Sequence, residues 1–96
     1  MSMHYIAVLV PEKGGGWSVI FPDLPGCATH GPTVHDAITT ASGAASTWLA
    51  ATCKSGDPIP APRSYEDIRA DDAWALDRGI DWSTTAVSLV PVDVVP

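Results

Sequence analysis

The stretch Trp17-Ser18-Val19-Ile20-Phe21-Pro22-Asp23-Leu24-Pro25-Gly26-Cys27 determines how the rest of this sequence can fold. Its first part, residues 17–21, is rich in aromatic and β-branched side chains and predicts a strand. Pro22 ends strand pairing because proline has no backbone N–H, and Pro25-Gly26 fits the centre of a type II turn. A short strand over residues 27–31 follows. The stretch therefore predicts two antiparallel strands joined by a proline-containing turn.

Upstream of this stretch, residues 4–10 form an unbroken apolar run that predicts a first strand. The segment Lys13-Gly14-Gly15-Gly16 separates it from the next strand. Glycine adopts positive φ without steric cost, so this segment is typical of a tight hairpin turn. Residues 4–31 are therefore predicted to form an antiparallel, three-stranded meander.

Downstream, a long helix is predicted over residues 34–55. Thr33 stands three residues before Asp36, which is a variant of the capping box at a helix N-terminus. Gly43 inside the helix suggests a close approach to a neighbouring backbone. Apolar positions recur at spacings of three and four and give one buried stripe: Val34, Ile38, Ala41, Ala45, Trp48, Leu49 and Thr52.

The helix is followed by a proline-rich loop and an irregular insertion over residues 56–83. A short helical turn is predicted at Tyr65–Arg69, again from a capping pattern. Trp74 and Trp82 lie among polar residues without a clean period. This part of the chain predicts no regular element beyond short helical turns.

A last strand is predicted over residues 86–95, and Pro91 inside it favours an edge position or a bulge. The length fits a single domain, 1–96, of the α+β class. One helix covers only one face of a sheet, although the first strand is apolar on both faces. We expect the other face to meet a second subunit, a partner protein or the 74–82 segment folding back. The small core favours a homo-oligomer, a dimer or a tetramer.

The charge balance narrows the class of partner. Acidic side chains outnumber basic ones by eleven to five, and the formal net charge is −6. The cations are scattered, which argues against direct binding to nucleic acid, whereas an acidic chain suits a basic partner. No apolar run approaches the roughly 20 residues of a membrane helix, and the start of the sequence does not resemble a signal peptide. We therefore predict a cytoplasmic protein without membrane contact.

No group of residues predicts catalysis. A two-metal nuclease site needs several converging carboxylates, and the strands predicted at 4–10 and 17–21 contain none. Cys27 and His30 have a ligand-like spacing, but strand alternation places them on opposite faces and a second ligand pair is missing. We predict no enzymatic activity, no cofactor and no metal site, and we expect Cys27 and Cys53 to be reduced.

Partner binding is predicted at the start of the quoted stretch. Trp17 and Phe21 share one face of their strand, and that face is a candidate for the one without a helix. Aromatic side chains carry much of the energy of protein interfaces. Asp23 and Leu24, in the adjacent turn, could complete such a surface. The predicted partner-binding residues are therefore Trp17, Phe21, Asp23 and Leu24.

Three stretches of the sequence resemble the HicB antitoxin family. Residues 16–27 match its pattern G-(W/Y)-x-V-x-F-P-D-L-P-G-C, and residues 56–62 match G-x-P-I-P-x-P. Residues 29–37 match T-x-G-x-T-x-x-E-A, with Asp36 in the place of the glutamate. The resemblance implies a partial ribonuclease H-like fold of order β-β-β-α-β. One long helix would cover one face, and the last strand would be added parallel to the first, with the helix as the crossover.

The resemblance also implies a function. It indicates an antitoxin that binds and neutralises a HicA-type mRNA-cleaving toxin without catalysing a reaction. Family members often carry an additional DNA-binding segment, whereas here we expect no C-terminal DNA-binding domain. An alternative stays open: an orphan scaffold or small-molecule-binding domain of the same fold with no toxin partner, in which the tryptophans of the insertion line a ligand cleft.

Overall fold

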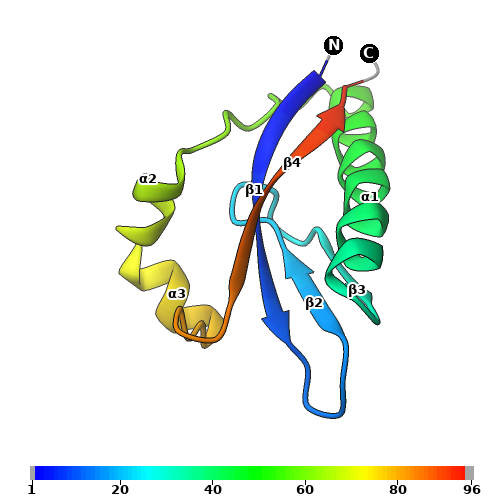
Figure 1. Ribbon diagram of the computed structural model, residues 1–96. Helices are drawn as coiled ribbons and strands as arrows, with labels where there is room; N and C mark the ends of the chain where they lie inside the picture. The colour runs from blue at the N-terminus through cyan, green and yellow to red at the C-terminus, as the bar shows by residue number, and fades with distance from the viewer. Residues whose placement is uncertain (1, 95–96) are drawn as a thin grey trace.

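The apolar runs of the sequence form a four-stranded antiparallel sheet in the order β3-β2-β1-β4. The computed structural model describes residues 2–94, and its elements are shown in Figure 1. The elements are β1 Ser2–Pro11, β2 Trp17–Ile20, β3 Ala28–Gly31, α1 Val34–Lys54, α2 Tyr65–Arg69, α3 Asp72–Arg78 and β4 Ala86–Asp93. The predicted end of the last strand, Val95, lies outside the described residues.

The hairpin between β1 and β2 forms as its glycines predict. Gly14, Gly15 and Gly16 all have positive φ, and the N–H of Glu12 donates to the carbonyl oxygen of Gly16 at 2.9 Å. The register pairs Val8 with Ile20. Strand β3 then pairs antiparallel with β2, so the three-stranded meander is present.

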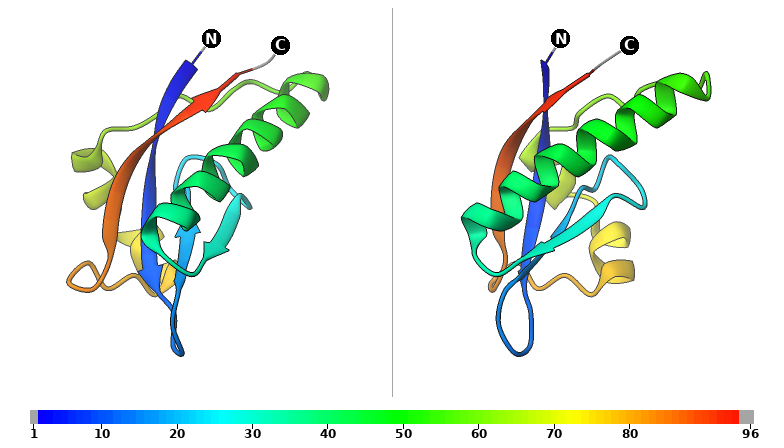
Figure 2. Two further views of the ribbon diagram at one scale, coloured as in Figure 1. Left: turned by 45° about the vertical axis from the view of Figure 1, so that its right-hand side comes forward. Right: turned by 90° about the vertical axis from the view of Figure 1, so that its right-hand side faces the viewer.

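Helix α1 packs along one face of the sheet through small side chains (Figure 2). The hydroxyl of Thr33 accepts a hydrogen bond from the N–H of Asp36 at 3.1 Å and caps the helix. The buried stripe consists of Ala37, Ala41, Ala45 and Leu49. No helix within residues 2–94 has both the length and the apolar character needed to span a membrane.

Two glycines show where the helix does and does not approach the sheet closely. A Cβ on Gly31 would lie 2.5 Å from the backbone nitrogen of Ala37, so the end of β3 and the first turn of α1 fit only without a side chain. A Cβ on Gly43 would meet nothing within 4 Å. The close approach predicted at Gly43 is therefore found at Gly31 instead.

The main core lies between α1 and the sheet. It joins alternate residues of β1 to residues of β2, the following turn, α1 and β4. Its buried members are Tyr5, Ala7, Leu9, Val19, Phe21, Leu24, Cys27, Ala37, Ala41, Ala45, Leu49, Val90, Val92 and Val94. The two-residue period of β1 thus places its odd-numbered residues under α1.

The prediction that the last strand runs parallel to the first is wrong. Strand β4 pairs antiparallel with β1, from Ser2 opposite Asp93 to Leu9 opposite Ala86. A strand starting directly after α1 would run parallel to β1, because α1 ends near the N-terminus (Figure 1). Residues 55–85 instead return the chain to the other end of the sheet before β4 begins. The insertion therefore adds one more chain reversal.

The second face of the sheet is covered in part by the same insertion. Helices α2 and α3 lie on the side of the sheet opposite α1 (Figure 1). Ile6 and Val8 point to that side and are buried, as is Ile68 of α2, although none of the three belongs to the main core. Of the three expected ways of covering this face, the structure shows the chain folding back on itself.

Candidate partner-binding site

The residues predicted to bind a partner lie on the α1 side of the sheet. Phe21 is 1% exposed and Leu24 is 0% exposed, and both belong to the main core. Trp17 is half-buried and packs against the same core. The face proposed for Trp17 and Phe21 as free of a helix is therefore the covered one, and Trp17 alone of these three keeps accessible surface.

The turn after β2 is tightly hydrogen-bonded. The N–H of Leu24 donates to the carbonyl oxygen of Phe21 at 3.1 Å, and the N–H of Cys27 donates to that of Leu24 at 3.0 Å. From α1, the indole N–H of Trp48 donates to the carbonyl oxygen of Pro25 at 3.1 Å. These bonds attach the turn to the helix on one side and leave Asp23 on the other.

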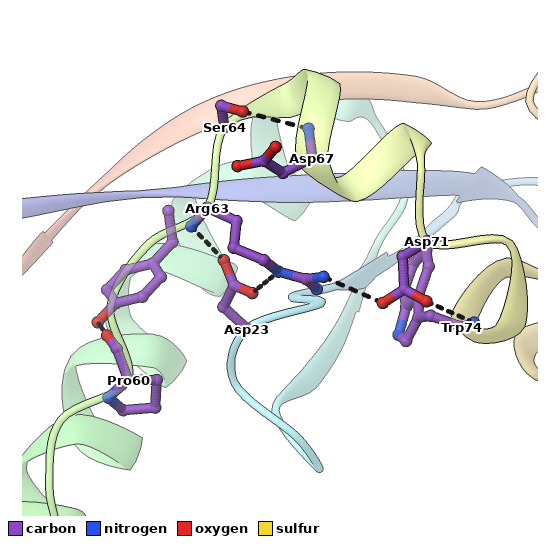
Figure 3. Close-up of polar contacts among 8 residues, drawn as sticks. Asp23, Pro60, Arg63, Ser64, Asp67, Asp71 and Trp74 are labelled. Carbon is purple, nitrogen blue, oxygen red and sulfur yellow. Dashed lines mark hydrogen bonds and ion pairs between the residues drawn. The ribbon is translucent and has the colours of Figure 1, made fainter.

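Asp23 forms an ion pair with Arg63 of the proline-rich loop (Figure 3). The Nε of Arg63 donates to Oδ1 of Asp23 at 2.6 Å, and the backbone N–H of Arg63 donates to Oδ2 at 2.7 Å. Only 8% of the Asp23 side chain is exposed, against 35% for Arg63. Both carboxylate oxygens thus accept hydrogen bonds from Arg63, and Asp23 connects the turn after β2 to the proline-rich loop.

Arg63 continues this connection to α3. Its Nη1 donates to Oδ2 of Asp71 at 3.0 Å, while Oδ1 of Asp71 accepts the N–H of Trp74 at 3.1 Å and caps the helix. The hydrogen bond from Arg63 is the main reason that the pKa of Asp71 is lowered, and the bond from Trp74 is the second. We refer to Asp23, Arg63 and Asp71 as the carboxylate–arginine clamp.

Tyr5 attaches the proline-rich loop to the sheet at a second point. Its hydroxyl donates to the carbonyl oxygen of Pro60 at 2.6 Å. Burial is the first cause of the raised pKa of Tyr5, and the negative charge of Asp23 is the second. The proline-rich loop is therefore attached to the rest of the fold at two points, Pro60 and Arg63.

Aromatic side chains gather around Arg69 on the insertion. The guanidinium carbon of Arg69 lies 4.8 Å from the ring centre of Trp82 and 5.7 Å from that of Tyr65. The ring of Trp74 lies 6.3 Å from that of Trp82. Such distances are typical of cation–π and tilted aromatic pairs. This cluster gives an otherwise irregular segment a defined shape.

The same segment, residues 65–82, concentrates the negative charge of the chain. We call it the acidic α2–α3 segment. It contains six of the eleven acidic residues but only two basic ones, Arg69 and Arg78. Its acidic residues are Glu66, Asp67, Asp71, Asp72, Asp77 and Asp81.

An apolar side chain stands in the middle of this charge. Leu76 of α3 is 85% exposed, and the neighbouring Asp72, Ala73 and Asp77 are also exposed on the outer side of the helix. A charged rim around an accessible leucine is suited to contact with a basic protein. This outer side of α3 is the part of the candidate site that sequence reasoning missed.

Two features of the sequence could have located the site. Arg63 is the one cation in the proline-rich stretch at residues 57–63, and the acidic residues cluster after it.

The candidate metal ligands do not converge: residues 2–94 contain no group of three or more His, Cys, Asp or Glu side chains suited to a metal. Cys27 and Cys53 are free, and burial raises the pKa of the Cys27 thiol.

Comparisons with solved structures agree with this fold. A toxin–antitoxin complex from Streptococcus pneumoniae superimposes with a TM-score of 0.79 and 22% identity, covering 97% of this chain and 70% of that one. The Burkholderia pseudomallei antitoxin HicB gives a TM-score of 0.74 at 23% identity, covering 95% of this chain and 64% of that one. A HicA3 and HicB3 toxin–antitoxin complex gives 0.65 at 24% identity, covering 98% and 100%.

Family membership rests on the sequence itself. No curated protein matches the chain significantly. The family described as "HicB_like antitoxin of bacterial toxin-antitoxin system" matches residues 5–95, which include most of the sheet, α1 and the acidic α2–α3 segment. The chain therefore belongs to the HicB-like antitoxin family.

Proposed function

We propose that this chain is a non-catalytic, cytoplasmic antitoxin domain that binds and neutralises a HicA-type mRNA-cleaving toxin. Membership of the antitoxin family supports this proposal, as do the structural neighbours solved as toxin–antitoxin complexes. The observation that carries it is the acidic α2–α3 segment, with Leu76 exposed at its centre. We also propose that the chain forms a homo-oligomer.

The electrostatic argument follows from what the toxin must bind. A protein that cleaves mRNA needs a positive surface, because the RNA backbone carries a negative charge at each phosphate. The acidic α2–α3 segment carries carboxylates, whose negative charge is opposite to that of such a surface. Its six acidic residues outnumber its two basic residues, so the segment keeps a net negative charge. Occupation of the toxin's positive surface by this segment would exclude RNA.

The residues predicted from the sequence contribute to this proposal in different ways. Asp23 would position the acidic α2–α3 segment through Arg63 instead of touching the toxin. Phe21 and Leu24 would support the turn from within the core, since neither has accessible surface. Trp17 is half-exposed and could contact the toxin directly.

Co-expression with a HicA-type toxin tests the function. We expect growth to be rescued and the two proteins to elute together in size-exclusion chromatography. The double substitution Asp72→Asn with Asp77→Asn should slow association about tenfold at low salt, because steering by complementary charge acts on the association rate. Stopped-flow association measurements at two salt concentrations read this out.

A matched control separates local charge from net charge. Asp57→Asn with Asp93→Asn removes the same number of charges at exposed positions outside the segment, and it should leave the association rate within about twofold. Equal effects of the two double variants would contradict the proposed surface. Failure of the wild-type chain to rescue growth or bind the toxin would instead favour the orphan scaffold, for which the aromatic cluster around Arg69 is the candidate binding feature.

A further inference from the structure

Strand β4 is one edge of the sheet, and the hydrogen-bond pattern shows which of its backbone groups face outward. The N–H of Glu12 donates to the carbonyl oxygen of Gly16. By alternation, the backbone N–H and C=O groups of the even-numbered residues of β1 point toward β2. The odd-numbered residues therefore face β4, where Tyr5 pairs with Val90 and Ala7 with Ser88. By the same alternation, the N–H and C=O groups of the odd-numbered β4 residues point away from the sheet.

The C-terminal half of this edge is closed. Pro91 has no N–H to offer, and its carbonyl oxygen accepts a hydrogen bond from the hydroxyl of Ser42 at 2.8 Å. The carbonyl oxygen of Asp93 accepts one from Ser46, also at 2.8 Å. Proline and capped carbonyls are standard protections of edge strands against pairing with another chain.

The N-terminal half of the edge is open. The outward backbone groups of Val87 and Leu89 make no hydrogen bond within residues 2–94. The Leu89 side chain is 57% exposed. In Figure 1 the strand faces the viewer, with α1 on one side and α2 and α3 on the other, and no element crosses in front of it. An open, apolar edge of this kind is a template for another strand.

The charge of the edge favours a second copy of the same chain over a basic toxin. No charged residue occurs between Thr84 and Val92, although the chain carries a net charge of −6. Two copies repel each other least where this uncharged strand meets its own counterpart, whereas a basic protein gains nothing there.

We propose that two copies pair antiparallel through β4, about a two-fold axis at Ser88. In this register each Val87 exchanges both of its outward hydrogen bonds with Leu89 of the second copy. The pairing ends where Pro91 of one chain would meet Thr85 of the other, since proline cannot donate. The two sheets join into one continuous sheet, with both copies of α1 on the same face. This inference deepens the homo-oligomer part of the proposed function and does not depend on toxin binding.

Sedimentation velocity at micromolar concentrations tests the pairing. The wild-type chain should sediment as a dimer, and Leu89→Lys should sediment as a monomer, because each lysine would place a charge opposite the apolar Val87 of the second copy and diagonally across the axis from the other lysine. The control Leu76→Lys places the same charge on α3 and should remain dimeric. Circular dichroism spectra that match the wild type show that each variant is folded.

A cross-link tests the register independently. The tested chain carries Cys53→Ala, so that this thiol cannot react. In that background, Ser88→Cys should form a covalent dimer on mild oxidation. Residues facing each other at a non-hydrogen-bonded pair lie about 4.5 Å apart at Cα, within disulfide range. Ser83→Cys, in the preceding turn, should stay monomeric under the same treatment. A wild-type monomer, or a dimer that Leu89→Lys leaves intact and Ser88→Cys does not cross-link, would overturn the inference while leaving toxin binding untouched.

Discussion

At the scale of single residues, the carboxylate–arginine clamp explains why an aspartate stands in the middle of the Phe-Pro-Asp-Leu-Pro-Gly string. The carboxylate of Asp23 accepts two hydrogen bonds from Arg63, forty residues away in the chain. Arg63 in turn reaches the cap of α3 through Asp71. One nearly buried carboxylate thus determines where the acidic α2–α3 segment is held.

Loss of the arginine should loosen this connection. We expect Arg63→Met to lower the free energy of unfolding by about 2 kcal/mol, the range of charge-assisted hydrogen bonds, reduced by the partial exposure of the guanidinium. The control Arg78→Met removes an exposed cation whose Nε lies 3.9 Å from Asp77, and it should cost under about 0.5 kcal/mol. Urea unfolding measures both. Equal costs would show that the clamp adds no stability of its own.

Asp71 of the clamp makes the free energy of unfolding depend on pH. Because the pKa of Asp71 is lowered in the folded chain, its carboxylate stabilises the fold above the unfolded pKa of about 3.9. That contribution is lost as the pH falls through the lower folded value. The wild type should therefore exceed Asp71→Asn in stability near neutral pH, and the difference should shrink below about pH 4. Urea unfolding at several pH values checks this, with Asp57→Asn as the control. A difference independent of pH would contradict it.

At the scale of elements, the contact between β3 and α1 depends on the absence of a side chain at Gly31. Gly31→Ala should destabilise the fold by about 2 kcal/mol, because the added Cβ meets the backbone of Ala37 and the helix must shift. Gly43→Ala should stabilise it by about 1 kcal/mol, since alanine is the better helix former and open space surrounds this position. Thermal unfolding compares the two variants. Effects of the same sign would refute this view of the helix–sheet contact.

The elements themselves follow closely from local sequence. The helix predicted over residues 34–55 is observed at Val34–Lys54, and the turn of helix predicted at Tyr65–Arg69 is α2. Capping hydroxyls and an apolar period act over a few residues, so they can be read without knowledge of the rest of the chain. The direction of β4 could not be read in this way, because it depends on where residues 55–85 travel.

At the scale of the whole molecule, the sheet lies between α1 on one face and the helices of the insertion on the other (Figure 1). The insertion covers Ile6 and Val8 from the side opposite α1 and brings Arg63 to Asp23. Both faces of the sheet carry apolar side chains that must be shielded from water, and the insertion shields part of the face that α1 leaves open. Two of the accessible surfaces, the outer side of α3 and the open half of β4, differ in charge and suit different partners.

Sequence alone determined the strands, the long helix, the α+β class and the family, because propensity, capping and a rigid motif are properties of neighbouring residues. Tertiary structure alone decided that β4 runs antiparallel to β1, that Phe21 and Leu24 are core residues, and that Asp23 holds Arg63. Each of these facts joins segments far apart in the chain. Local patterns say which side chains need burial or a counter-charge, but only the complete fold selects the distant residue that provides it.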